Sequence, residues 1–170
     1  MKQLERIHRS FLLKETLISI LINAILSGVI AFFMFRSQST ITLWGKNGLF
    51  FDLIPTIFIM TFLMTLAMTP VTRARILKGK APGVPWHRSE HHIFRFVPGA
   101  FIIRAFVFGA VALLLLLPTT TAWVYFLTKF PLTLTEMVMF KSCYGALVGL
   151  LFTPAIIIVA MTDKAGNKGT

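Results

Sequence analysis

The third apolar block of the chain, residues 99–126, reads GAFIIRAFVFGAVALLLLLPTTTAWVYF and decides the class of fold. Three further apolar blocks cover residues 17–35, 53–72 and 137–161. An α-helix rises 1.5 Å per residue, so about 20 apolar residues cross a hydrocarbon core about 30 Å thick. Each block has about this length or exceeds it. The sequence therefore predicts an all-α, four-transmembrane-helix bundle, and a single integral membrane domain over residues 1–170.

The composition also indicates a membrane protein. Hydrophobic residues make up 56% of the chain and charged residues 14%, whereas soluble domains carry about 25% charge. The first block follows basic residues, as in a signal peptide, but no small-residue cleavage site appears before Arg36. We therefore expect it to be retained as a span. The expected helices cover about residues 15–35, 53–72, 99–124 and 137–161, with a kink or stop near Pro118.

Basic residues gather on one side of the predicted membrane. Thirteen of the 17 lysines and arginines lie in the two terminal segments, the loop of about residues 76–97 and the adjoining helix ends; the other four are Arg36, Lys46, Lys129 and Lys141. Cytoplasmic loops are enriched in Lys and Arg, so both termini and this loop are predicted to be cytoplasmic, in a bacterial inner membrane. The net charge of +11 then requires no nucleic-acid partner. Anionic lipid headgroups are the expected partners of Arg73, Arg75, Lys78, Lys80, Arg88 and Arg95.

Two segments that lie 84 residues apart are similar. Residues 63–70 read LMTLAMTP and residues 147–154 read LVGLLFTP, and the same offset aligns Asp52 with Glu136. A two-span unit that occurs twice gives two tandem helical hairpins in parallel orientation. Chance similarity between apolar segments is the alternative that the sequence leaves open.

The second block ends in a proline followed by basic residues, Thr69-Pro70-Val71-Thr72-Arg73-Ala74-Arg75. A two-helix unit with this ending resembles a family of small bacterial membrane proteins of unknown function. The resemblance covers one hairpin or both, and it implies no activity.

Residues 87–92 read HRSEHH and form a candidate metal site. Imidazole binds iron, zinc, copper and nickel, and the H-x-x-x-H-H spacing resembles the boxes of membrane desaturases and hydroxylases. Those enzymes use several boxes, and the four histidines of this chain are too few for such a centre. Two interpretations stay open: a single metal ion bound by His87, His91, His92 and Glu90, or a solvated basic loop at anionic headgroups.

Met60, Met64 and Met68 share one face of the second helix, because they are four residues apart. Thioethers select Cu(I). The fourth predicted helix carries a GxxxG motif, Gly145 to Gly149. A methionine ladder beside such a helix resembles eukaryotic copper-uptake channels. Those channels have three spans and methionine-rich outer tails, whereas this chain has four predicted spans and no such tail. Adaptable packing is the alternative role of such methionines.

Small and polar residues form stripes on the predicted helices. Such stripes let membrane helices approach closely and form hydrogen bonds with one another. The residues expected to pack helices together are Ser19, Asn23, Ser27, Gly145 and Gly149. Further stripes contain Thr61, Thr65 and Thr69 on the second helix and Ala105 and Gly109 on the third.

No ionisable residue lies at the centre of a block. Arg104 and Lys141 lie near block ends, where their long side chains are expected to extend to the membrane surface. Transporters driven by ions usually carry a central ionisable group, so this pattern disfavours that class. No esterase, zinc-protease or nucleotide-binding motif is present, and the single cysteine, Cys143, excludes an intrachain disulfide.

These observations predict a small structural, accessory or assembly protein without catalytic or cofactor-binding residues. We expect it to associate with itself or with another membrane protein through the small-residue faces of the first and fourth helices. The alternatives are an oligomeric transporter or channel for small solutes or metal ions, lined by the methionine and threonine faces, and a metal-dependent membrane enzyme that uses His87–His92.

Overall fold

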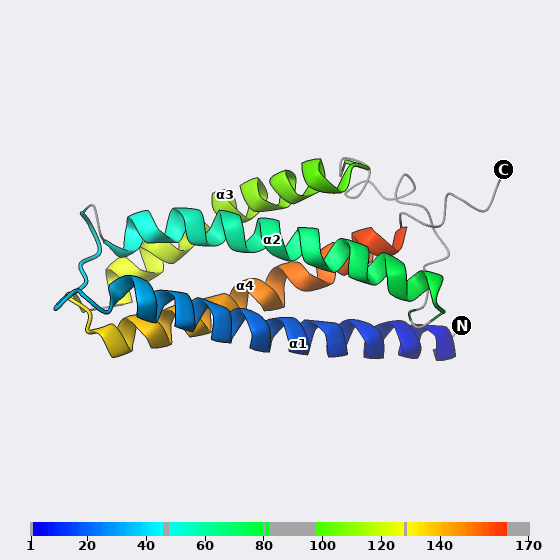
Figure 1. Ribbon diagram of the computed structural model, residues 1–170, viewed down its shortest axis with the longest axis horizontal. Coiled ribbons are helices and arrows are strands. Elements are labelled where there is room, and N and C mark those ends of the chain that lie inside the picture. Colours follow the sequence, from blue (N-terminus) through cyan, green and yellow to red (C-terminus); the bar gives the residue numbers. More distant parts are fainter. Residues whose placement is uncertain (1, 46–47, 80, 82–97, 128, 163–170) are drawn as a thin grey trace.

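The computed structural model describes residues 2–45, 48–79, 81, 98–127 and 129–162 (Figure 1). Within these residues the chain forms four long helices and no strand: α1 (Lys2–Phe35), α2 (Leu49–Leu77), α3 (Phe101–Leu127) and α4 (Leu134–Thr162). All four are long and apolar enough to span a membrane. The predicted all-α bundle of four spans is thereby confirmed.

The four helices run in alternating directions, so the bundle has two different ends (Figure 1). The terminal end is where α1 and α3 begin and where α2 and α4 finish. The loop end carries the connections between α1 and α2 and between α3 and α4, which the structure describes at residues 36–45, 48 and 129–133. Backbone hydrogen bonds join these two connections, from Ile41 N to Leu132 O at 2.9 Å and from Leu132 N to Ile41 O at 2.8 Å. Both hairpins are therefore fastened to each other at the loop end.

The helices are longer than the sequence predicts. Helix α1 begins at Lys2 rather than near Glu15, because residues 2–15 contain neither Gly nor Pro and favour a helix. Helix α3 continues through Pro118 to Leu127, so the predicted stop is wrong. The Thr119 hydroxyl donates to the carbonyls of Leu115 at 2.8 Å and Leu116 at 3.1 Å. Such side-chain hydrogen bonds satisfy backbone groups near a proline in a membrane helix.

Helix α4 is the most buried of the four helices. It packs against α1 and α2, and α2 packs in turn against α3. In the most apolar window of each helix, 56% of the residues of α4 are buried, compared with 22% for α3. Figure 1 shows α3 diverging from α4 toward the terminal end. The buried polar contacts described below connect α1, α2 and α4, which we call the core helices, and α3 packs mainly against α2.

Glycines bring α1 and α4 close together. A Cβ atom on Gly145 would lie 2.5 Å from the backbone oxygen of Asn23, and one on Gly149 would lie 3.3 Å from the Cα atom of Ile20. We expected the small-residue faces of these two helices to bind other chains. In the structure they face each other within one chain, because only residues without bulky side chains permit so close an approach.

Alanine substitutions at two glycines of this interface should have different effects. A Cβ atom on Gly145 meets backbone, which cannot move aside, whereas the closest atom to a Cβ on Gly28 is the Ser142 hydroxyl, which can rotate away. We expect Gly145→Ala to lower the free energy of unfolding by about 1–3 kcal/mol, and Gly28→Ala to lower it less. Detergent-induced unfolding in mixed micelles measures both. Equal stability of the two variants would contradict the close backbone contact.

Candidate functional site

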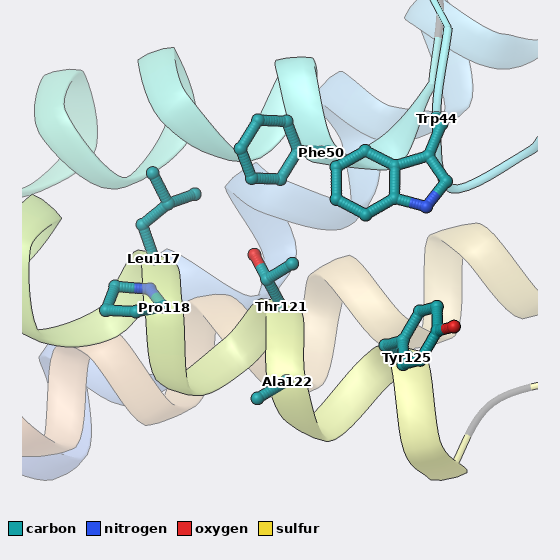
Figure 2. Close-up of a pocket in the computed structure, with 7 residues that line it drawn as sticks. All are labelled: Trp44, Phe50, Leu117, Pro118, Thr121, Ala122 and Tyr125. Carbon is teal, nitrogen blue, oxygen red and sulfur yellow. The ribbon is translucent and has the colours of Figure 1, made fainter.

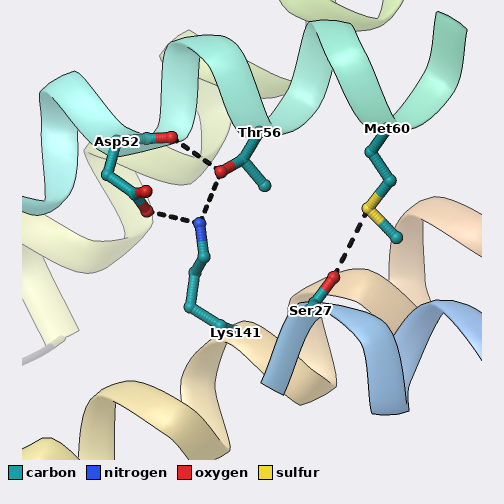
Figure 3. Close-up of polar contacts among 5 residues, drawn as sticks. All are labelled: Ser27, Asp52, Thr56, Met60 and Lys141. Atoms are coloured by element: carbon teal, nitrogen blue, oxygen red, sulfur yellow. Dashed lines mark hydrogen bonds and ion pairs between the residues drawn. The ribbon is translucent and has the colours of Figure 1, made fainter. Parts of the chain in front are cut away.

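The largest departure from the sequence prediction concerns Lys141. Its side chain is 2% exposed and forms an ion pair with Asp52, whose side chain is 7% exposed (Figure 3). The Lys141 ammonium also donates to the Thr56 hydroxyl at 2.6 Å, and that hydroxyl donates to the Asp52 carbonyl at 2.7 Å. Lys141 therefore points into the bundle, and the expectation that it extends to the membrane surface is wrong. An acid on α2 lies within its reach, so the charge is neutralised inside the protein.

This ion pair joins α2 to α4 at a definite rotation and height. Lys141 lies about 10 Å along α4 from the first residue of that helix, within the span Leu134–Thr162. Removing two charges from water costs several kcal/mol per ion, and mutual attraction with further hydrogen bonds offsets that cost. The contact with Thr56 supplies one such bond. The arrangement thus favours one relative position of α2 and α4.

Glu136, which the 84-residue offset aligns with Asp52, has a different role. It is exposed, and its carboxylate accepts hydrogen bonds from the Thr133 backbone N–H and hydroxyl, both at 2.8 Å. The Thr133 hydroxyl accepts one in return from the Glu136 N–H at 3.3 Å. This is a capping box at the start of α4. The aligned acids therefore share a position near a helix start but not a function.

A second polar cluster lies where α1, α2 and α4 meet. The Thr153 hydroxyl donates to the Ser19 hydroxyl at 2.6 Å, and Asn23 Nδ2 donates to the same oxygen at 2.9 Å. Met64 Sδ accepts from Asn23 and Thr153 at 3.4 Å and from Ser19 at 3.5 Å. The Ser27 hydroxyl similarly donates to Met60 Sδ at 3.5 Å. Asn23 thus has its partners on neighbouring side chains within the bundle.

These groups form one line, which we call the polar seam. It contains Asp52, Thr56, Met60 and Met64 of α2, Ser19, Asn23 and Ser27 of α1, and Lys141 and Thr153 of α4. A second ion pair, between Glu15 of α1 and Arg75 of α2, lies beyond the seam toward the terminal end. Polar contacts therefore connect the core helices along most of their length.

The chemistry of the seam favours packing over conduction. A thioether accepts hydrogen bonds but cannot donate them, so Met60 and Met64 interrupt any chain of proton donors. Their sulfur atoms also accept hydrogen bonds from α1 and α4, which competes with binding of Cu(I). Met68 is half-buried and packs against the hydrophobic core. The methionine ladder thus contacts neighbouring helices inside a single chain.

The threonine stripe is also internal. Thr61, Thr65 and Thr69 are fully buried, and α2 is covered by both α3 and α4. The Thr65 hydroxyl donates to the Thr61 carbonyl at 2.8 Å. Within the described part of the chain, the hydroxyls of Thr61 and Thr69 have no hydrogen-bond partner.

The basic residues near the terminal end have varied surroundings. Arg104 is fully buried and donates to the carbonyl of Pro98 at 3.2 Å and of Gly99 at 3.4 Å, so it does not extend outward as expected. Its guanidinium is retained by backbone carbonyls that precede α3. Of the predicted headgroup contacts, Arg75 pairs with Glu15 and Lys78 is exposed. Arg73 is half-buried; Lys80, Arg88 and Arg95 lie outside the described residues.

The predicted histidine site also lies outside the described residues, since His87, His91 and His92 fall between 82 and 97. Among residues that the structure describes, no three His, Cys, Asp or Glu side chains form a group that could hold a metal ion. Cys143 is exposed on α4.

Two apolar grooves flank α3 near the loop end. The α2–α3 groove has a volume of ≈ 530 Å³ and lies between α3, the connection 36–48 and the start of α2 (Figure 2). Its lining residues are Trp44, Phe50, Leu117, Pro118, Thr121, Ala122 and Tyr125. The α3–α4 groove has a volume of ≈ 620 Å³. Both grooves lie beside α3, the least buried of the four spans.

No protein-family model, curated protein or solved structure matches the chain. The resemblance of Thr69–Arg75 to small bacterial two-helix proteins therefore stays a prediction.

Removing one member of the Asp52–Lys141 pair should destabilise the bundle strongly. Lys141→Met leaves a buried carboxylate without its partner, and we expect a loss of about 3–5 kcal/mol in the free energy of unfolding. The double variant Asp52→Leu/Lys141→Met should recover most of that loss, because no charge is left behind. Glu136→Gln, at the exposed acid of the same end, is the control with a smaller effect. The free energies of unfolding of the parent, both single variants and the double variant form a double-mutant cycle. If the losses of the two single variants simply add in the double variant, the two side chains are not coupled.

Proposed function

We propose that the protein is a structural or accessory component of a bacterial inner membrane, which assembles with another membrane protein or with a second copy of itself. The observation that supports this proposal is that the buried polar groups point toward neighbouring helices of the same chain. Ion pairs, hydroxyls and Asn23 connect α1, α2 and α4 to one another. Such contacts specify a rigid helix arrangement, which suits a scaffold better than a site of chemistry.

The proposed orientation places the terminal end in the cytoplasm. The basic residues near this end support it through the positive-inside rule, and exposed Lys78 is available to anionic headgroups. The loop end, with the exposed aromatic residues Trp44 and Tyr125, then lies at the outer surface, where such residues commonly anchor a span.

We also propose that the two hairpins are tandem copies of one unit. Helix α4 packs against α1, α2 packs against α3, and α2 and α4 contact each other. Exchanging the first hairpin with the second leaves this pattern of neighbours unchanged, as expected for a parallel repeat. The packing therefore supports the tandem repeat that the similarity of residues 63–70 and 147–154 suggests.

Photo-cross-linking in native membranes tests the accessory role. A photoreactive amino acid is introduced at one exposed position of each helix: Leu21, Leu63, Leu114 or Leu150. At least one position should give a discrete protein adduct, since an assembly partner must cover part of the exposed surface. Fully buried Val148 is the control and should give none. A monomeric purified protein with no protein adduct at any of the four positions would overturn the proposal.

Transport of a small solute or metal ion by an oligomer is the second candidate function. The buried Asp52–Lys141 pair favours it, because ionisable groups within membrane spans often mark transport pathways. Copper is the metal that Met60, Met64 and Met68 would select. The third candidate is a metal-dependent enzyme in which His87, His91 and His92 bind the ion.

Metal analysis of the purified protein separates these candidates. The accessory role predicts that Met60→Leu/Met64→Leu/Met68→Leu and His91→Ala leave both metal content and cellular copper tolerance unchanged, since neither set would bind metal. Met139→Leu, at an exposed methionine of α4, is the matched control. Stoichiometric copper that is lost only in the triple variant would establish the copper role, and stoichiometric metal lost in His91→Ala would establish the enzyme.

A further inference from the structure

The gap between α3 and α4 is incompletely filled by protein. These helices are consecutive in the chain and antiparallel, and near the loop end the Thr120 hydroxyl donates to the Tyr144 hydroxyl at 3.1 Å. Beside this contact lies the α3–α4 groove of ≈ 620 Å³. Its lining residues are Leu116, Thr119, Thr120 and Trp123 of α3 and Met139, Phe140, Cys143, Tyr144 and Leu147 of α4.

The groove lies within the membrane-spanning parts of both helices. Its walls extend from Leu116 to Trp123 on α3 and from Met139 to Leu147 on α4, inside the two candidate spans. At 1.5 Å per residue these walls are about 10–12 Å long. Trp123 is 56% exposed and Met139 is 63% exposed, so the groove is open sideways, toward the lipid.

The groove's own chemistry requires an apolar occupant. The Thr119 hydroxyl donates to backbone carbonyls of its helix, and Thr120 and Tyr144 bond to each other. The other lining groups are aliphatic chains, aromatic rings, a thioether and a thiol. Water, sugars and ions would find few hydrogen-bond partners here, and burying polar groups without partners is costly.

The groove opens sideways toward the lipid, so a flexible hydrocarbon chain can enter it from the membrane. The corresponding gap between α1 and α2 differs, because side chains of the two helices meet across it, as in the contact of Ser27 with Met60.

We propose that the α3–α4 groove binds an acyl chain of a membrane phospholipid, which packs against Trp123, Phe140 and Leu147. Exposed Lys129 follows α3 by two residues at the loop end, and supplies a positive charge near the level where the lipid phosphate lies. The bound lipid completes the packing of α3 against α4. This inference does not depend on the proposed function.

Quenching of Trp123 by brominated lipid tests the proposal. In Trp44→Phe/Trp86→Phe, Trp123 is the single tryptophan. The protein is reconstituted in phosphatidylethanolamine–phosphatidylglycerol vesicles in which a small fraction of the phosphatidylglycerol carries bromine on its acyl chains. A chain retained in the groove stays beside Trp123, so we expect about twofold stronger quenching than for an equally exposed reporter outside the groove.

The matched reporter is Phe33→Trp in a background without other tryptophans. Phe33 is 61% exposed and lies near the loop end of α1. Leu147→Phe should fill the groove and reduce Trp123 quenching to the level of that reporter, and Leu21→Phe on α1 should leave it unchanged. Equal quenching of Trp123 and the reporter, or no effect of Leu147→Phe, would overturn the proposal.

The native cysteine distinguishes lipid from a second copy. Cys143 lines the groove and is exposed. If the same groove of a second copy packed against this one, a short bismaleimide would join the Cys143 residues of the two chains efficiently in these vesicles, and that result would contradict a lipid site. Native mass spectrometry should show one phospholipid retained by the parent protein and lost from Leu147→Phe; no retained lipid in the parent would also contradict it.

Discussion

A charge in the hydrocarbon core of a membrane needs a partner, and Lys141 finds its partner on another helix, at Asp52. The Asp52 carboxylate and the Thr56 hydroxyl both accept a hydrogen bond from the ammonium group. That geometry sets the rotation and height of α4 relative to α2. Because α4 also packs tightly against α1, the ion pair indirectly positions all three core helices.

The rest of the core follows from this placement. With α4 fixed against α2, the glycines of α4 face α1. The backbones of α1 and α4 then approach until Gly145 contacts the Asn23 carbonyl. The same placement brings Thr153 to Ser19 and Met64. In hydrocarbon these polar groups have no water to bond with, so each contact disfavours sliding of one helix along another.

The four spans could be predicted from the sequence because crossing a membrane is a local property of about 20 residues. The Asp52–Lys141 contact could not, because it depends on which helices are neighbours and on which face each presents. A signal was present nonetheless: Asp52 directly precedes the second apolar block and Lys141 lies inside the fourth, near ends that the topology places on the same side. The methionine ladder was predicted on one face, but its role depends on the hydroxyls and the amide that α1 and α4 bring to it.

The two hairpins close their internal gaps by different means. Between α1 and α2, hydroxyl, amide and thioether groups meet directly and hold the helices together. Between α3 and α4, Thr120 and Tyr144 make the described polar contact, and aliphatic and aromatic side chains line the space beside it. Polar contacts are directional and fix a helix in place, whereas apolar contacts with lipid leave it free to adjust. The polar contacts therefore fix α1, α2 and α4 relative to one another, whereas α3 is held mainly by its packing against α2.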